Sequence, residues 1–142
     1  MSVAQFFMNG THMDFEATPP TTQTFSPEFF AMLKETSCVN STAYFVKEEG
    51  KEDKEIGSKT ELAIILLLLN LGHSDYQEVR KDVLSRENRL FAFSSKRKRS
   101  SIVITPADHA GKRVHVKGAS EVVLSRCTQY LDEQGNPKPL TD

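Results

Sequence analysis

The chain has 142 residues, of which 38% are hydrophobic and 26% are charged, and its formal net charge is −1. This length and composition predict a single soluble globular domain that is large enough to bury a core. A net charge so close to zero produces no overall field that would attract nucleic acid or a membrane surface, so we expect no nucleic-acid partner.

Cysteine usage and hydropathy further limit the classes of protein to which the chain can belong. Cys38 and Cys127 have neither a disulfide framework nor a metal-ligand spacing, which favours a reducing compartment. The most apolar run, Leu62–Leu69, is far shorter than the roughly 20 residues that span a bilayer. The start of the chain lacks the basic region of a signal peptide. We therefore expect a cytosolic domain, monomeric by itself and without a metal site of its own.

The first 24 residues predict a hairpin followed by a linker. Residues 3–8 alternate between two faces, Asn9-Gly10 is a favoured tight-turn pair, and His12–Phe15 forms the returning strand. The Pro- and Thr-rich stretch from Ala17 to Thr24 is expected to be exposed.

A first helix is predicted from Ser26-Pro27-Glu28 to about Cys38. Serine as N-cap, proline at the first helical position and an acid in the first turn are all favourable helix starts. A short strand at Tyr44–Val46 follows. Lys47 to Glu55 alternates in charge and holds a glycine, so it predicts a solvated loop.

Two further helices are predicted in the middle of the chain. Glu61 to Leu71 is apolar nearly all round and predicts a buried helix that ends at Gly72, with Ser58 as its N-cap. The next helix is expected to begin at Ser74, because Gln77 stands at capping-box spacing from it, and its apolar residues are Tyr76, Val79, Val83 and Leu84.

The stretch from Phe91 to Glu121 predicts strands around a polar loop. Phe91 and Phe93 are expected to share one strand face by their spacing, and Ile102–Ile104 is a β-branched run. In the run that ends at Lys117, residues 113, 115 and 117 alternate with two valines, so Lys117 is expected on a polar face at a strand end.

Two small residues separate this strand from the next helix. Gly118 and Ala119 precede Ser120, which is a predicted N-cap for a helix that runs through the valines towards Cys127. A strand end, a lysine, two small residues and a helix start allow a flat or anionic ligand to approach the backbone closely. Together these elements predict an α+β fold, with a mostly antiparallel sheet flanked by helices.

Three short motifs in the same order resemble one family. K-G-A-S-E at 117–121, F-S-S-K-R-K-R-S-S at 93–101 and G-S-K-T-E at 57–61 are similar to the nucleotide-binding domain of P-type cation pumps. Ser after K-G-A, and Lys before T-E, resemble the plasma-membrane calcium pump subfamily most. The resemblance extends over nearly the whole chain.

The resemblance implies an ATP site at particular residues. The adenine would stack on Phe93, with Ser94 beside it, and Glu61 would lie against the base. Lys117 would line the same pocket with Gly118 and Ala119, and Lys98 would lie near the phosphates. Two positions depart from the family pattern: Ser95 is often Arg there, and Ser100 replaces a Met, so one phosphate contact is lost and the pocket floor is less apolar.

The residues by themselves also allow ordinary structural roles. Glu61 is at capping-box spacing from Ser58, so its carboxylate could satisfy backbone N–H groups. Phe93 could be a core residue, and Lys117 an ordinary exposed lysine. The basic residues 96–99 could be a solvated turn, or a patch through which a non-enzymatic module docks an acidic protein or anionic lipid.

The parent protein implied by the resemblance is a membrane-embedded, ATP-driven calcium transporter. Its phosphoryl transfer goes to the Asp of D-K-T-G-T-L-T, a motif absent from this sequence, with Mg²⁺ on the phosphates. We therefore expect a fragment of the domain, lacking a further strand with a phosphate-contacting Arg beyond Asp142. It would hold no catalytic residue, bind ATP without hydrolysing it, and work with actuator, phosphorylation and transmembrane domains.

Overall fold

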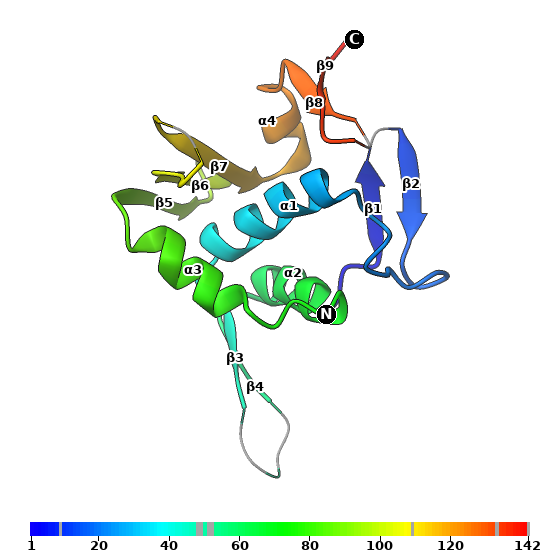
Figure 1. Cartoon of the computed structure of the whole chain (residues 1–142), viewed down its shortest axis with the longest axis vertical. Coiled ribbons are helices and arrows are strands. Elements are labelled where there is room, and N and C mark those ends of the chain that lie inside the picture. The colour runs from blue at the N-terminus through cyan, green and yellow to red at the C-terminus, as the bar shows by residue number, and fades with distance from the viewer. Residues whose placement is uncertain (9, 48–49, 51–52, 109, 133, 142) are drawn as a thin grey trace.

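The computed structural model describes residues 1–8, 10–47, 50, 53–108, 110–132 and 134–141. Within these residues it has four helices and nine strands, and every strand pair is antiparallel (Figure 1). The predicted α+β class is therefore confirmed. The strands are distributed over three two-stranded hairpins and one three-stranded sheet, which lies on one side of the helices (Figure 1).

The chain begins with the predicted hairpin. Strands β1 (Gln5–Met8) and β2 (Thr11–Asp14) pair with Met8 opposite Thr11. Gly10 has a φ of +77°, the left-handed conformation that favours glycine in such a turn. Asn9, the other residue of the predicted turn, lies outside the described residues.

The first two helices begin where their caps predict. Helix α1 (Pro27–Val39) has Ser26 as N-cap, whose Oγ accepts a hydrogen bond from the N–H of Phe29 at 3.3 Å. Helix α2 (Lys59–Asn70) has Ser58 as N-cap. Gly72, with a φ of +83°, ends α2, and hydrogen bonds from residues 72 and 73 back to its last carbonyls complete a Schellman motif.

The other two helices start one residue away from the predicted caps. The N-cap of α3 (Tyr76–Leu84) is Asp75 rather than Ser74, and the Asp75 carboxylate accepts a hydrogen bond from the Lys34 ammonium at 2.8 Å. Helix α4 (Ser120–Leu124) has Ala119 as N-cap rather than Ser120, and it ends before Cys127. These two predictions were wrong because neither helix start is held by a side-chain capping bond.

Strands β3 (Tyr44–Val46) and β4 (Lys54–Ile56) form a hairpin that projects away from the helices (Figure 1). The predicted loop was therefore too long, since its last two residues belong to β4. The segment itself has no strand pattern. It becomes a strand because it pairs with β3, where Glu55 lies opposite Phe45. Residues 48–49 and 51–52 of that loop lie outside the described residues.

The three-stranded sheet contains β5 (Asn88–Ser94), β6 (Arg99–Ile104) and β7 (Arg113–Gly118). The predicted alternation in β7 is confirmed, but its polar side faces the helices. His115 is 5% exposed, whereas Val114 is 56% exposed on the opposite face. The polar residues are accommodated inside because α1 offers partners: Glu35 accepts hydrogen bonds from Arg113 and His115, each at 2.8 Å.

The chain closes with the hairpin of β8 (Gln129–Leu131) and β9 (Pro137–Pro139). The Asp132 carboxylate accepts N–H hydrogen bonds from Gln134 and Asn136, at 3.0 and 2.8 Å, and these bonds hold the turn between the two strands.

Two apolar clusters form the core. One lies between the helices and the inner face of the sheet, and it includes Cys38, Val39, Ile65, Leu68, Tyr76, Val83, Ile102 and Ile104. The other joins the N-terminal hairpin to α1 and α2 and is rich in aromatic rings: Phe6, Phe15, Phe25, Phe29 and Phe30. None of the helices in the described part of the chain is long and apolar enough to cross a membrane.

Candidate nucleotide site

An ion pair between Lys117 and Glu61 is the centre of the candidate site. Lys117 lies near the end of β7, and Glu61 lies in the first turn of α2, 56 residues earlier in the chain. The Lys117 ammonium donates to the Glu61 carboxylate and to the backbone carbonyl of Asn40. Both charged side chains are mostly buried, with 27% of Lys117 and 18% of Glu61 exposed.

The second carboxylate oxygen of Glu61 is held by the segment after α1. It accepts hydrogen bonds from the Ser41 hydroxyl at 3.3 Å, the Thr42 N–H at 3.1 Å and the Thr42 hydroxyl at 3.4 Å. Burial by itself raises the pKa of Glu61, but the hydrogen bond and charge of Lys117, together with Thr42 and Ser41, hold its pKa below the usual range. Glu61 is therefore an ionised acceptor.

The capping alternative for Glu61 holds only for its backbone. Its N–H donates to the Ser58 hydroxyl at 3.2 Å, which is the capping bond of α2. Its carboxylate instead reaches across to β7. One residue thus serves the helix start through its main chain and the ion pair through its side chain.

The ion pair forms one wall of a cavity of about 250 Å³. The remaining walls come from α1, α2 and the N-terminal segment, and most are apolar. The lining residues are Val3, Phe6, Leu33, Thr36, Ser37, Asn40, Ser41, Glu61, Ile64, Leu67 and Lys117. The arrangement offers an apolar slot with a cation and an anion at one side, as expected for a flat ligand with polar edges.

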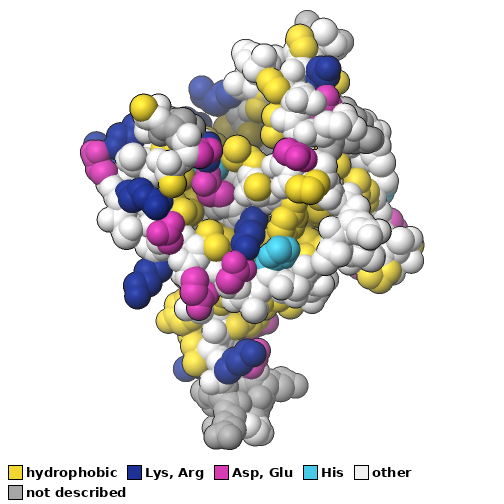
Figure 2. All heavy atoms as spheres, in the orientation of Figure 1, with side chains coloured by type: hydrophobic (Ala, Val, Ile, Leu, Met, Phe, Trp, Pro, Cys, Tyr) yellow, Lys and Arg dark blue, Asp and Glu magenta, His cyan; other side chains and the backbone are white. Residues whose placement is uncertain are grey.

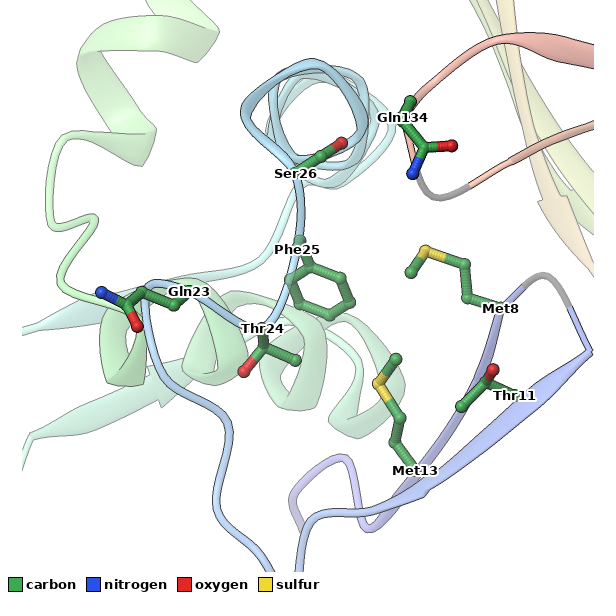
Figure 3. A pocket seen from close by; sticks show the side chains of 8 residues that line it. All are labelled: Met8, Thr11, Met13, Gln23, Thr24, Phe25, Ser26 and Gln134. Carbon is green, nitrogen blue, oxygen red and sulfur yellow. The ribbon is translucent and has the colours of Figure 1, made fainter.

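A larger cavity, of about 320 Å³, lies between the N-terminal hairpin, the linker and the turn before β9 (Figure 3). Its walls are two methionines, one phenylalanine and uncharged polar side chains. In Figure 3, Met8, Met13 and Phe25 point towards the space between them, whereas Gln23 points away from it. None of the described residues that line it has an ionisable side chain. The 250 Å³ cavity is therefore the better candidate for binding a charged or polar ligand.

Phe93 is 64% exposed, so it is not the core residue that one interpretation allowed. The prediction that it shares a strand face with Phe91 is wrong. Phe91 pairs with Ser101 and Ser94 pairs with Arg99, so Ala92 and Phe93 together lie opposite Ser100, as in a β-bulge. Ser100 in turn lies opposite Lys117 on β7, so Phe93 lies at the Lys117 end of the sheet.

The glycine after Lys117 has a packing reason in this structure. A Cβ atom on Gly118 would lie 2.6 Å from the Cβ and 2.8 Å from the Cα of Arg99, which are impossibly short contacts. The Ala119 N–H donates to the Lys98 carbonyl at 3.0 Å. The small residues at 118 and 119 therefore let the end of β7 lie tightly against Lys98 and Arg99.

The basic turn, residues 95–98, contains the first three of the basic residues 96–99 and is held by Ser94. The Ser94 carbonyl accepts hydrogen bonds from the N–H groups of Arg97 and Lys98, at 3.0 and 2.7 Å. Lys98 has a φ of +53°, and its ammonium lies 3.6 Å from the carboxylate of Glu121. Among the predicted site residues, the structure thus joins Glu61 to Lys117, and it joins Ser94, Lys98 and Ala119 through the turn.

Sequence reasoning missed Asn40, Ser41 and Thr42. Their only local signal is a polar triplet directly after the apolar end of α1, which is typical of any helix C-terminus. Their role becomes visible only once β7 and α2 are placed beside them.

On the face shown in Figure 2, the charges of the described residues do not single out another site. Figure 2 shows basic and acidic side chains interspersed over one face, with hydrophobic side chains between them. This agrees with the net charge of −1.

The structure thus combines a helix-flanked antiparallel fold with a charged pair at one wall of a largely apolar cavity. The sequence matches the family described as P-type ATPase, cytoplasmic domain N, over residues 28–142, and the chain belongs to this family.

Full-length calcium pumps are among its relatives. The chain is 42% identical to calcium-transporting ATPase PAT1 of Dictyostelium discoideum over 79% of its length. It is 34% identical to the plasma membrane-type calcium-transporting ATPase 8 of Arabidopsis thaliana over 100%, and 32% identical to human plasma membrane calcium-transporting ATPase 4 over 99%. These matches cover 10%, 12% and 11% of the relatives, so the chain spans about a tenth of their length.

Proposed function

We propose that this chain binds ATP as the nucleotide-binding domain of a P-type calcium pump. The observation that carries the proposal is the Lys117–Glu61 pair at one wall of the 250 Å³ cavity. That volume lies just below the roughly 300–1,000 Å³ that encloses a drug-sized ligand. It suits a base held inside, with the sugar and phosphates outside.

The chemistry of the pair suits adenine. The ionised Glu61 carboxylate is an acceptor for the exocyclic amine of the base, and the Lys117 ammonium is a donor for its ring nitrogens. The exposed ring of Phe93 offers an apolar face on which a base can stack. The pair would satisfy the polar edge of the base. Phe93 does not line the cavity, so its ring would stack on the base from outside the cavity.

The triphosphate would extend towards the basic turn. Lys98 and its neighbours offer charge-assisted hydrogen bonds to phosphate oxygens. Mg²⁺ would travel on the phosphates, where it neutralises the charge that develops during transfer. The residues of this chain would bind and orient the nucleotide; the accepting Asp would belong to the D-K-T-G-T-L-T motif, which this sequence lacks.

Calcium transport by the parent protein is part of the same proposal. It rests on the names of relatives that are about ten times longer than this chain. In that protein the domain would present ATP to a phosphorylation domain and work with actuator and membrane domains. Its place would be on the cytosolic side of a cellular membrane.

The test is an NMR titration of the chain with ATP, ADP, AMP and inorganic triphosphate. We expect the three nucleotides to shift amides near Glu61, Phe93 and Lys117, with dissociation constants on the order of millimolar, about −4 kcal/mol. Shifts confined to residues 96–99, reproduced by triphosphate and abolished by salt, would instead identify a charge-docking patch for acidic partners or lipids.

A further inference from the structure

Asn40 is a buried hydrogen-bonding hub next to the candidate site. It is 2% exposed and is the C-cap of α1, where its N–H donates to the Thr36 carbonyl at 3.1 Å. Its side-chain amide donates to the His115 carbonyl on β7 at 3.3 Å and accepts from the Ser100 hydroxyl on β6 at 3.4 Å. One residue thereby fastens the end of α1 to two strands of the sheet.

The backbone carbonyl of the same residue accepts a hydrogen bond from Lys117. Lysine has a four-carbon stem with many rotamers, so its ammonium is defined only by the acceptors around it. Here the acceptors are the Asn40 carbonyl and the Glu61 carboxylate. The first is immobilised by the amide of Asn40, and the second by Ser41 and Thr42.

We propose that Asn40 is the positioning residue of the nucleotide pocket, which holds the Lys117 ammonium in place for the base, with Ser41 and Thr42 holding Glu61 in the same way. This inference rests on the proposed function. Asparagine suits the role because one planar amide supplies a donor for His115 and an acceptor for Ser100. Alanine supplies neither, so residue 40 then loses its side-chain anchors to β6 and β7 and keeps only its backbone bond to Thr36.

The test compares Asn40→Ala with Val39→Ala in the whole chain. Val39 is the matched control because it is the preceding residue, is also 2% exposed, and packs in the apolar cluster. Both variants lose stability, but only Asn40→Ala removes an anchor of the Lys117 acceptor.

The first measurement needs no nucleotide. The side-chain ¹³Cε and ¹⁵Nζ resonances of Lys117 should move towards those of an unstructured lysine in Asn40→Ala and stay near their original positions in Val39→Ala. The second measurement is titration with ATP and AMP. The dissociation constants of both should rise about tenfold in folded Asn40→Ala, the size expected for a lost hydrogen-bond network, and remain within about twofold in Val39→Ala.

A folded Asn40→Ala protein with unchanged Lys117 resonances and unchanged nucleotide affinity overturns the inference. If the original chain binds no nucleotide, the proposed function fails, while the Lys117 resonances still decide whether Asn40 positions the lysine. If Asn40→Ala does not fold, Ser100→Ala decides, because it removes the hydroxyl bond to the Asn40 amide and leaves Asn40 in place. An affinity about threefold weaker supports the inference, and an unchanged affinity overturns it.

Discussion

Replacing Phe93 by alanine should weaken nucleotide binding far more than it weakens the fold. Burying a whole phenylalanine side chain stabilises a protein by about 1.5–3 kcal/mol. Phe93 is 64% exposed, so only about a third of that, about 0.5–1 kcal/mol, should be lost from the free energy of unfolding. Stacking of a base on an aromatic ring contributes about 1–3 kcal/mol, so the dissociation constant for ATP should rise about 5- to 150-fold.

Phe91 is the matched control on the same strand. It is 36% exposed, and the Arg89 guanidinium lies 5.0 Å from its ring centroid. Phe91→Ala should therefore cost about 1–2 kcal/mol in lost burial and a further 0.5–1 kcal/mol, roughly, in lost cation–π attraction. The register shift places the two rings on different faces of the strand. The ATP affinity of folded Phe91→Ala should therefore stay near that of the original chain.

The assay is urea unfolding and ATP titration on both variants. The expected pattern is opposite in the two measurements: Phe91→Ala unfolds at lower urea, and Phe93→Ala binds ATP less tightly. If Phe93→Ala unfolds the domain while Phe91→Ala is stable and no longer binds, the stacking ring has been assigned to the wrong aromatic residue.

Two further predictions concern the sheet. Burial lowers the pKa of His115, against the opposing effect of Glu35, so the unfolded chain binds a proton that the folded chain resists. The free energy of unfolding should be highest above the ordinary histidine pKa of 6.5 and should fall as the pH drops below that value. Urea unfolding between about pH 7.5 and 5 should show this pH dependence in the original chain. The same dependence in His115→Gln would contradict the prediction. Gly118→Ala should cost about 1–3 kcal/mol of stability, because its Cβ would collide with Arg99, and an unchanged thermal midpoint would refute that contact.

Local signals in the sequence were sufficient to predict the elements whose stabilising hydrogen bonds lie within their own segment. Ser26 and Ser58 cap helices within their own segments, and Gly72 ends α2 with bonds to residues in the same helix. The first hairpin and the alternation in β7 are likewise properties of a few consecutive residues. The motifs at 57–61, 93–101 and 117–121 also indicated the family, because their residues and order are specific in themselves.

The tertiary structure determined those helix starts, strand registers and side-chain roles that depend on residues far apart in the sequence. Asp75 replaces Ser74 as the N-cap of α3, and its carboxylate is engaged by Lys34 from another helix. The register shift at Ala92–Phe93 exists only relative to β6, and it reverses a side-chain direction that period-2 spacing predicts. In the same way, Asn40 joins Lys117 across 77 residues of sequence, so its role follows from packing rather than from any local pattern.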